Sequence, residues 1–479
     1  MEKRIINFFI VTFLFLITYT YLVSKFSPQN TAPFIPSSQV ISKEPVEEDL
    51  TTISQSLEKI EIDKFIVTVC LTGGYIKNVF IKEYNEELNF QDIGLILSDK
   101  EEFSLKRPSS NVIILENEDL GIKKIWEFND YIVKMKINSS SNKKISLFSL
   151  ILSLDGLEQR YQEILYKERD KNIIRTPLVK IKKLEKNNLE ILGGRDRYYT
   201  LVLFNGIYDT VINRINKKIN LSTHTKENEW VFYIGPQLSK ELAKYNLEEI
   251  INYGFFHDIG IVIIKIFYFI NYFVKNWGIS IVFLSIIIYI ILFPFTFKST
   301  KAMKKMQELQ PLIEEIREKY KDSPQKLNKE ILEMYKKNKI NPLGGCLPLL
   351  FQFPILFAIY QVFLRLIELK GVKFLWIEDL TLPDRAFKLP FNLPFLGNYI
   401  NLLPLIIIGL TYFQQKLTTP KNSSPEQTSM GIIFMILIGV IFYNFPSCIV
   451  IYWLIQNLLT LIYQYRVSKI KKYPLRTVS

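Results

Sequence analysis

The most constraining feature of this sequence is the stretch NPLGGCLPLLFQFP at residues 341–354, where a basic segment gives way to a hydrophobic one. Glycine, proline and glutamine cost free energy in lipid unless neighbouring helices or water satisfy the polar groups involved. The stretch therefore predicts a point where the chain enters a membrane beside a polar cavity. Any fold assigned to the chain must provide that cavity.

The composition, 48% hydrophobic and 14% aromatic over 479 residues, is typical of a chain that combines membrane spans with a soluble domain. Three cysteines in separate contexts and two histidines give neither a disulfide framework nor a metal site, and no Walker-type glycine loop occurs. We therefore expect no enzyme, no cofactor and no bound metal. The net charge of +13 lies beside apolar spans, which indicates a cytoplasmic membrane face rather than DNA.

The N-terminal region predicts a membrane anchor followed by a linker. Lys3 and Arg4 precede an apolar run at residues 5–23, which as a helix is about 28 Å long and able to span the bilayer. A cleaved signal peptide is the alternative, but the run is long and lacks a clear small-x-small cleavage site, so residues 1–26 favour a retained signal anchor. Residues 27–50, rich in Pro, Ser and Glu, indicate a linker.

The short alternating segments of residues 51–257 predict an extracytoplasmic all-β domain with a sandwich fold. In YIVKMKI at 131–137, Val133, Met135 and Ile137 share one face while the two lysines take the other, as a half-buried antiparallel strand requires. Further strands are expected at 65–71, 75–84, 198–204 and 230–234, and a helix near 239–253. The scattered polar residues on these strands could bind a ligand such as a sugar, but polar residues on strands more commonly form solvated faces.

The next segments predict an amphipathic helix lying in the membrane interface and then a five-span core. At 258–275 the polar residues Asp258, Lys265, Tyr268, Tyr272 and Lys275 follow one helical stripe, and a crossing here would turn the later basic loops outward. The core covers 276–465, with spans near 277–297, 343–367, 399–415, 429–443 and 447–464. Residues 298–342 carry 12 Lys or Arg against 7 Asp or Glu and are placed in the cytoplasm. With the anchor, this gives six spans, both termini cytoplasmic, and a basic tail at 466–479.

The cytoplasmic segment 298–342 predicts an antiparallel helical hairpin. Met303 and Met306 begin an apolar stripe at helical spacing, residues 322–325 break it, and Met334 lies on a second stripe. Packing of the two stripes on each other is the simpler interpretation. A docking face for another protein is the alternative, since methionine makes adaptable contacts.

Polar residues inside the predicted spans must face protein or water rather than lipid. Ser285 and Tyr289 lie four residues apart on the first core span, Gln456 and Thr460 do the same on the last, and Gln352 lies on the second. Tyr289 is about 18 Å along its helix from Trp277, slightly beyond the midplane toward the cytoplasm. The five residues predict a hydrated groove, with interhelical hydrogen bonding as the commoner alternative.

Long motifs in the C-terminal half resemble the YidC/Oxa/Albino family of membrane protein insertases. They are NWGISIV at 276–282, FPFTFKSTKAMKKMQELQP at 293–311, NPLGGCLPLLFQFPILFAIYQ at 341–361 and NFPSCIVIYWLIQNLLT at 444–460. TGGYIKNVFIKEY at 72–84 and FYIGPQL at 232–238 are similar to the bacterial branch, which has a large periplasmic domain.

The resemblance implies an insertase and chaperone of the bacterial inner membrane, whose groove opens to cytoplasm and lipid and receives nascent integral membrane proteins. Ser285, Tyr289, Gln352, Gln456 and Thr460 would line the groove, Tyr452 and Trp453 would contact the substrate helix, and the hairpin with Met303, Met306 and Met334 would help receive it. Membrane lipids, the Sec translocon and the ribosome are the other implied partners, and the sequence leaves open whether the protein works alone or beside Sec.

The chain departs from the resemblance at one groove position, where bacterial members usually carry an arginine and this chain has Tyr289. Either hydration and a phenolic hydroxyl suffice, or attraction to acidic clients is lost. Two rival classes are also open: a solute transporter or channel with a sensory domain, which the absence of internal repeats disfavours, and an envelope polysaccharide-binding protein that acts through its β domain.

Overall fold

The computed structural model describes residues 56–96, 101–139, 144–153, 156–224, 228–338, 347–393, 397–419 and 425–469. The expected N-terminal anchor and linker, residues 341–346 of the opening motif, and the tail beyond 469 lie outside these ranges. The chain divides into two compact units, Met1–Ile251 and Asn252–Ser479. We call their described parts the β unit and the helical unit, and describe each by itself.

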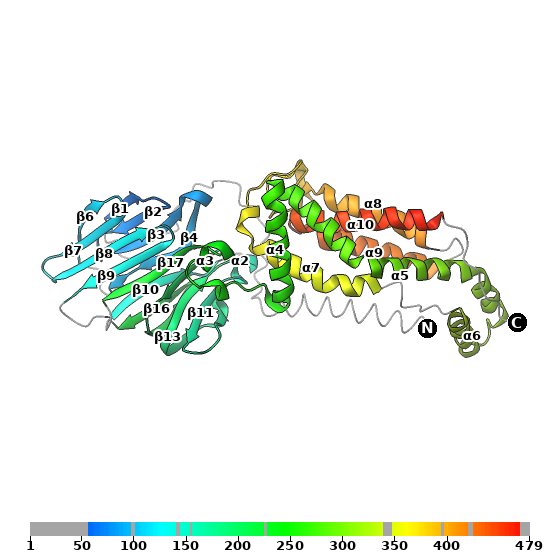
Figure 1. The fold of residues 1–479 in the computed structure, drawn as a ribbon, viewed down its shortest axis with the longest axis horizontal. Helices are drawn as coiled ribbons and strands as arrows, with labels where there is room; N and C mark the ends of the chain where they lie inside the picture. The colour runs from blue at the N-terminus through cyan, green and yellow to red at the C-terminus, as the bar shows by residue number, and fades with distance from the viewer. Residues whose placement is uncertain are drawn as a thin grey trace. The chain divides into compact units, whose positions relative to one another are not determined.

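The β unit consists of antiparallel strands in two layers that share one long strand (Figure 1). The first layer follows the order β1 (Leu57–Glu61), β2 (Phe65–Cys70), β3 (Tyr75–Ile81), β4 (Glu86–Ile93) with β5 (Leu95–Ile96), β10 (Lys144–Ile151), β16 (Lys218–His224), β15 (Tyr208–Ile215) and β13 (Lys183–Arg195). The second follows β6 (Ser104–Ser109), β7 (Val112–Asn117), β8 (Ile122–Asn129), β9 (Ile132–Asn138), β17 (Glu229–Pro236), β14 (Tyr199–Phe204), β13, β11 (Glu163–Glu168) and β12 (Ile174–Pro177).

Alternation of apolar and polar residues explains why the layers pack face to face. In β9, Val133, Met135 and Ile137 are buried while Lys134 and Lys136 are exposed, so the predicted orientation of this strand is confirmed. Phe65 of β2 and Phe128 of β8 bring their rings to 6.1 Å across the two layers. These contacts confirm the predicted sandwich, because large apolar side chains from both inner faces share one core.

A fully buried lysine joins the two layers near one end of the core. Lys124 of β8 donates from Nζ to the carbonyl oxygens of Gly73 at 3.0 Å, Gly94 at 3.2 Å and also Gly74. Gly73, Gly74 and Gly94 all have positive φ, in the turns on either side of β3 and β4. The ammonium group therefore ties two glycine turns of the first layer to a strand of the second.

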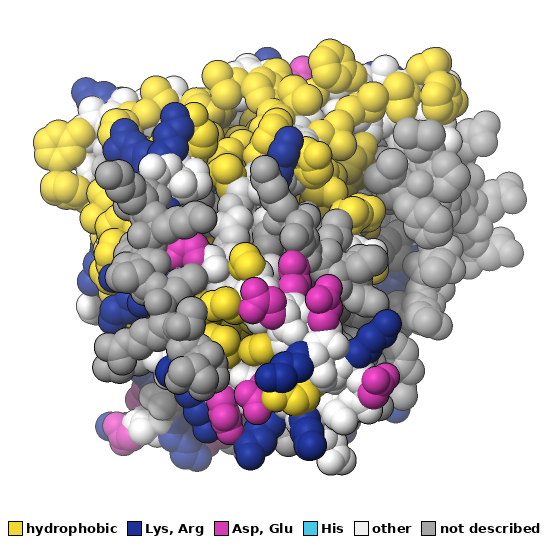
Figure 2. All heavy atoms as spheres, turned by 90° about the vertical axis from the view of Figure 1, so that its right-hand side faces the viewer, with side chains coloured by type: hydrophobic (Ala, Val, Ile, Leu, Met, Phe, Trp, Pro, Cys, Tyr) yellow, Lys and Arg dark blue, Asp and Glu magenta, His cyan; other side chains and the backbone are white. Residues whose placement is uncertain are grey.

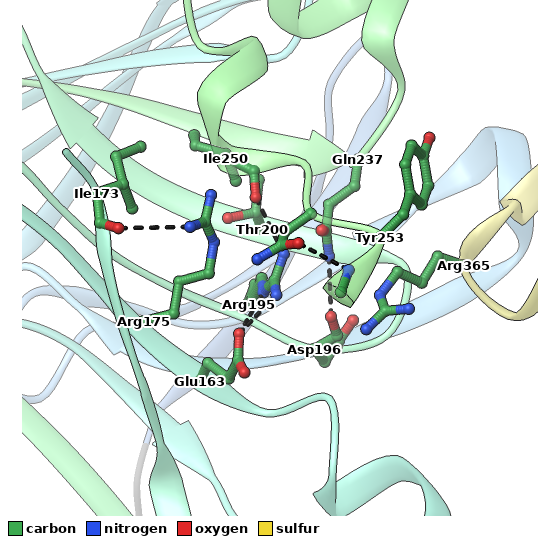
Figure 3. A network of polar contacts seen from close by, with 12 residues as sticks. Glu163, Ile173, Arg175, Arg195, Asp196, Thr200, Gln237, Ile250, Tyr253 and Arg365 are labelled. Carbon is green, nitrogen blue, oxygen red and sulfur yellow. Dashed lines mark hydrogen bonds and ion pairs between the residues drawn. The ribbon is translucent and has the colours of Figure 1, made fainter. Parts of the chain in front are cut away.

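A second buried polar cluster lies where β13 turns into β14 (Figure 3). Arg195 donates through Nε to Glu163 at 2.9 Å and through Nη1 to the Ile250 carbonyl at 3.0 Å. The Asp196 carboxylate accepts from the backbone N–H groups of Tyr198 and Tyr199 at 2.9 and 2.8 Å. Arg195 thereby holds the end of the β unit in place, because it binds the backbone of its last residues.

The stability of the β unit is expected to depend on the protonation of Asp196. Burial raises the pKa of this carboxyl from 3.8 to about 6, although the hydrogen bonds from Tyr199, Tyr198 and Asn89 act in the opposite direction. A raised native pKa means that the folded state binds more protons between these pH values, so stability falls as pH rises from 3.8 to about 6, by roughly 3 kcal/mol in all, and levels off above that. Unfolding curves measured from about pH 4 to about pH 7 should show this fall in the wild type and a flatter profile in Asp196→Asn. Equal slopes in the two proteins would contradict it.

The predicted helix at 239–253 is wrong in its extent. The structure has only α3 (Ser239–Ala243) and a 3-10 turn at Glu248–Ile250. Asn246 adopts a positive φ of 57° between them, a conformation that ends a helix. The aromatic side chain of Tyr245 instead packs beside Phe204 and Tyr233 of the β unit.

The helical unit contains α4 (His257–Val274), α5 (Trp277–Lys319), α6 (Pro324–Lys337), α7 (Leu347–Arg365), α8 (Leu402–Thr418), α9 (Pro425–Tyr443) and α10 (Ser447–Ser468). Within the described residues, three helices are long and apolar enough to cross a membrane: Gly254–Val274, Trp277–Lys319 and Ser447–Ser468. Phe351–Arg365 and Gly431–Tyr443 are shorter apolar helices. The helices follow the predicted spans closely, since each begins or ends within a few residues of its expected limit.

Helix α4 packs one face on its neighbours and exposes the other. Phe267 is buried, with its ring 5.2 Å from that of Phe363 in α7 and 5.5 Å from that of Trp277. The exposed face mixes Asp258 and Lys265 with Phe269. Such a mixture suits the boundary between headgroups and lipid, and the interfacial position of α4 stays a prediction.

Helix α5 runs without interruption from the first apolar span into the basic hairpin, through Pro294 and Pro311. The hairpin with α6 has its own small core of Leu309, Ile313 and Met334, against which Met306 packs. The predicted break at residues 322–325 is present but lies about two residues earlier, because α5 ends at Lys319 and α6 begins at Pro324. The two stripes therefore pack on each other, as the simpler interpretation predicts; Met303 is half-buried on α5, outside this core.

Candidate functional site

Four of the five expected groove residues lie together where α5 meets α10, in a group that we call the polar seam: Ser285, Tyr289, Gln456 and Thr460. Gln456 Nε2 donates to the backbone carbonyl of Ser285 at 2.8 Å, and the Tyr289 hydroxyl donates to the carbonyl of Leu459 at 3.2 Å. The spacing of four residues on each helix places both pairs on one face, so the two faces meet side by side. The seam thus joins the first and last core helices.

The remaining two hydroxyl groups bond within their own helices. Ser285 Oγ donates to the Ile281 carbonyl at 2.6 Å, and Thr460 Oγ1 donates to the Gln456 carbonyl at 2.8 Å. Ser285 is fully buried, and Gln456 and Tyr289 are only 5% and 9% exposed. In this conformation the seam faces the neighbouring helix, which is the interhelical role that the sequence left open beside the groove.

Gln352 belongs to a second polar contact on the same helix α10. Its Nε2 lies 3.4 Å from the hydroxyl of Tyr452, which is fully buried. Trp453, the other expected substrate contact, stacks on Phe442 of α9 with ring centroids 5.3 Å apart. Tyr452 and Trp453 therefore point to different neighbours, α7 and α9, and only Tyr452 adjoins an expected groove residue.

The structure adds two polar residues that the sequence analysis did not single out. Gln414 of α8 donates from Nε2 to the carbonyl of Asn457 at 2.7 Å, and Asn457 donates to the carbonyl of Trp453 at 2.7 Å. Asn457 directly follows Gln456, so its polarity within an apolar span was a usable signal. Helix α10 thus carries polar contacts to α5, α7 and α8 along its length.

The helices that carry these contacts contain no ionisable Lys, Arg, Asp or Glu over their apolar stretches, residues 277–297, 347–364 and 447–465. Hydrogen bonding at this depth is therefore supplied by neutral amides and hydroxyls. Among the described residues no group of three or more His, Cys, Asp or Glu is placed to hold a metal ion. The chemistry available is reversible hydrogen bonding to a polar chain.

The end of the helical unit that bears α6 separates apolar from charged surface (Figure 2). Apolar side chains gather over its upper part, while Lys, Arg, Asp and Glu gather in the lower part, toward the hairpin. Arg317 and Lys319 lie in the last turn of α5, and Lys336 and Lys337 in that of α6. Basic side chains at this boundary suit contact with phospholipid headgroups or acidic partners.

The β unit contains a separate hollow of about 590 Å³ on the outer face of its second layer. Five of its lining residues are direct cross-strand neighbours: Val112, Glu127, Lys134, Val231 and Phe204. Tyr245 forms another part of the wall. This hollow is the place where the sugar-binding option for the β domain could be tested.

These features define a class: a polytopic membrane protein whose helical core encloses neutral polar contacts and carries a basic hairpin and a large β unit. A family model described as "60Kd inner membrane protein" matches residues 269–474. Proteins named "Membrane protein insertase YidC" are similar: that of Helicobacter pylori is 28% identical over 98% of this chain and 96% of its own length, and that of Syntrophobacter fumaroxidans is 39% identical over 51% and 44%. Residues 269–474 therefore belong to the family of this model, and the chain as a whole is similar to YidC proteins.

The extent of these matches differs between relatives. For the Syntrophobacter fumaroxidans and Campylobacter jejuni proteins, the match covers 44% and 52% of the relative's length, so the chain spans about half of these relatives. A solved structure described as an active YidC insertase with its first transmembrane domain resolved is 19% identical over 86% of this chain and 94% of its own, with a TM-score of 0.44. A YidC structure from Thermotoga maritima gives a TM-score of 0.34 at 14% identity.

Proposed function

We propose that the protein is a membrane protein insertase and chaperone. It receives nascent integral membrane proteins, inserts them into the bilayer and helps them fold. The observation that carries this proposal is the set of neutral hydrogen-bonding side chains that α10 shares with α5, α7 and α8 inside otherwise apolar helices. The naming of relatives as insertases supports it. The reaction needs no nucleotide or cofactor, because a polar segment only exchanges its hydrogen bonds with water for hydrogen bonds with the protein.

The mechanism requires the polar seam to part and admit water and chain from the cytoplasm. A short polar segment of the client would then bond to Gln456, Tyr289 and Gln352, while its apolar helix slides past Tyr452 and Trp453 into lipid. Hydrating the inner half of the core shortens the apolar distance that the segment must cross. The seam bonds suit such opening, since interhelical hydrogen bonds in membranes average only about 0.6 kcal/mol.

The same proposal places the hairpin and both termini in the cytoplasm and the β unit in the periplasm. The charge of residues 298–342 supports this orientation, because basic loops are retained on the cytoplasmic side. The Sec translocon and the ribosome are proposed partners, the latter through the basic hairpin. Tyr289 replaces a positive charge by a phenolic hydroxyl in this scheme.

The proposal is tested by depleting the protein and following insertion of a membrane reporter with a short polar tail. We expect untranslocated reporter to accumulate, and the wild-type chain supplied in trans to restore insertion. A chain lacking residues 51–240 should restore most of it, because the contacts above all belong to the helical unit. Normal insertion after depletion would refute the insertase proposal. If the chain lacking residues 51–240 failed to restore insertion, the result would favour a protein that acts through its β unit.

A further inference from the structure

The segment between α7 and α8, residues 366–401, exposes large apolar side chains at one end of the helical unit. Leu375 is 74% exposed, and Phe387 and Phe391 are 59% and 58% exposed. Trp376 and Leu382 are partly exposed on the same segment. Five exposed large apolar side chains within one connection between helices favour a contact site over the single exposed residues that are normal for a soluble loop.

Leu375 lies at the tip of a tight turn, in a backbone conformation that suits glycine or asparagine. Phe374 N donates to the Ile377 carbonyl and Ile377 N to the Phe374 carbonyl, both at 2.9 Å, which leaves Leu375 and Trp376 as the two residues of the turn. The φ of Leu375 is +54°. Left-handed backbone is unfavourable for a bulky residue, and a turn in water would instead favour Asn or Gly there. The strained tip therefore presents leucine for contact.

The base of this turn is fixed to the ends of the membrane helices. Phe374 lies over Gly278 at the start of α5, where an added Cβ would come 2.1 Å from the aromatic ring. Cys448 N of α10 donates to the Leu380 carbonyl at 3.0 Å, and Ser447 N donates to the Leu382 carbonyl at 2.8 Å. Because the first turns of α5 and α10 hold the segment, its tip stays at the depth where these helices leave the bilayer.

The carboxylates of the segment are mostly turned inward, while its lysines face out. Asp384 is buried and accepts from the N–H groups of Leu402 and Leu403 at 2.7 and 3.1 Å, and from Trp376 Nε1 at 3.1 Å. Asp379 accepts from the backbone and hydroxyl of Thr381, both at 2.7 Å. On the exposed surface remain Lys370, Lys373 and Lys388 against Glu378.

We infer that Leu375 and Trp376, with Phe387 and Phe391, insert into the headgroup boundary of the leaflet opposite the hairpin, while the exposed lysines contact anionic phospholipid. Trp and basic residues favour this boundary, where one part of the side chain is apolar and another is hydrated. The lipid contact would fix the outer ends of α5, α7, α8 and α10 relative to the bilayer. It does not depend on the insertase proposal, only on the position of the helices in a membrane.

The depth of the tip can be measured with nitroxide labels on the full chain in nanodiscs of phosphatidylethanolamine and phosphatidylglycerol. Leu375→Cys and Phe391→Cys would each be labelled after replacement of Cys70, Cys346 and Cys448. Glu378→Cys is the matched control, exposed on the same segment but polar. We expect oxygen to relax the labels at 375 and 391 several-fold more, relative to a water-soluble nickel chelate, than the label at 378.

Two outcomes would overturn the inference. One is equal nickel access at all three positions, which would place the tip in water. The other is shielding of positions 375 and 391 from both oxygen and nickel, which would indicate burial against protein, as in a second copy of this chain. Phe391 carries no turn strain, so its label reports even if Leu375→Cys relaxes the turn. Replacing phosphatidylglycerol by phosphatidylcholine should reduce the depth at 375, and an unchanged depth would refute the role of the lysines.

Discussion

Lys124→Met is expected to destabilise the β unit by roughly 3 kcal/mol, because buried carbonyl groups left without a donor cost about 1 to 3 kcal/mol each. The wild-type ammonium group bonds to Gly73, Gly74 and Gly94, and methionine has a similar length but no donor. These glycines adopt positive φ in turns, and without the ammonium group the three carbonyl oxygens would lose the donor that Lys124 supplies. Pulse proteolysis of the full chain in urea would measure the change, since unfolding of the β unit exposes its cleavage sites.

The matched control is Lys123→Met, one residue earlier on the same strand. Lys123 is 38% exposed and lies 3.6 Å from Glu116, an exposed ion pair of the kind that contributes little to stability. The two variants change the net charge and the residue type identically, so they separate burial from charge. A similar loss of stability in both would show that Lys124 is not a link between the layers.

Lys124 also shows how far sequence reasoning reaches in the β unit. Among the runs that were recognised as strands, β9 alternates strictly between apolar and polar residues and the structure orients it accordingly, whereas β14 is buried along its whole length. In β8 the buried face is Ile122, Lys124, Trp126 and Phe128. The buried and exposed positions alternate, but Lys124 on the buried face hides this pattern in the sequence. Its burial depends on backbone carbonyls of turns that are far away in sequence, so no local pattern predicts it.

The helix that sequence reasoning mistook was decided by a single backbone position. The expected helix at 239–253 stops early because Asn246 takes a left-handed conformation. Asparagine adopts this conformation more readily than most residues but is also found in helices, so the sequence alone does not predict the stop. Helix α5 continues through two prolines, which usually end a helix. Gln310 and Leu312 beside Pro311 are good helix formers, and helices within a membrane tolerate proline because neighbouring groups satisfy the freed backbone.

The polar seam was predictable in its parts and not in its pairing. Spacing of four residues places Ser285 with Tyr289 and Gln456 with Thr460, whatever the fold. The pairing of α5 with α10, and of Gln352 in α7 with Tyr452, follows from how the helices pack. The apolar surfaces that decide this packing differ little in sequence. The partner of a polar group in a bundle is set by which helices are neighbours, and no local pattern encodes that.

Removing the hydrogen-bond donors of the polar seam is expected to show whether the seam receives client segments or only joins two helices. In the double variant Tyr289→Phe and Gln456→Leu, both interhelical hydrogen bonds are lost, while shape and apolar packing are largely kept. Two bonds of about 0.6 kcal/mol each are too weak to unfold the core. If the seam receives polar client segments, insertion of a reporter with a polar tail should fall about tenfold, which corresponds to 1.4 kcal/mol on the barrier.

The comparison needs a variant that removes a hydroxyl elsewhere in the same core. Thr411→Val serves, because Thr411 Oγ1 donates to the Ile407 carbonyl of its own helix α8 at 2.8 Å. Protein abundance and insertion should stay near wild type in Thr411→Val, while the double variant keeps its abundance but loses insertion. A double variant that inserts the reporter as well as wild type would show that Tyr289 and Gln456 only join α5 to α10. The client path would then lie along another face of α10, such as the one that contacts α7.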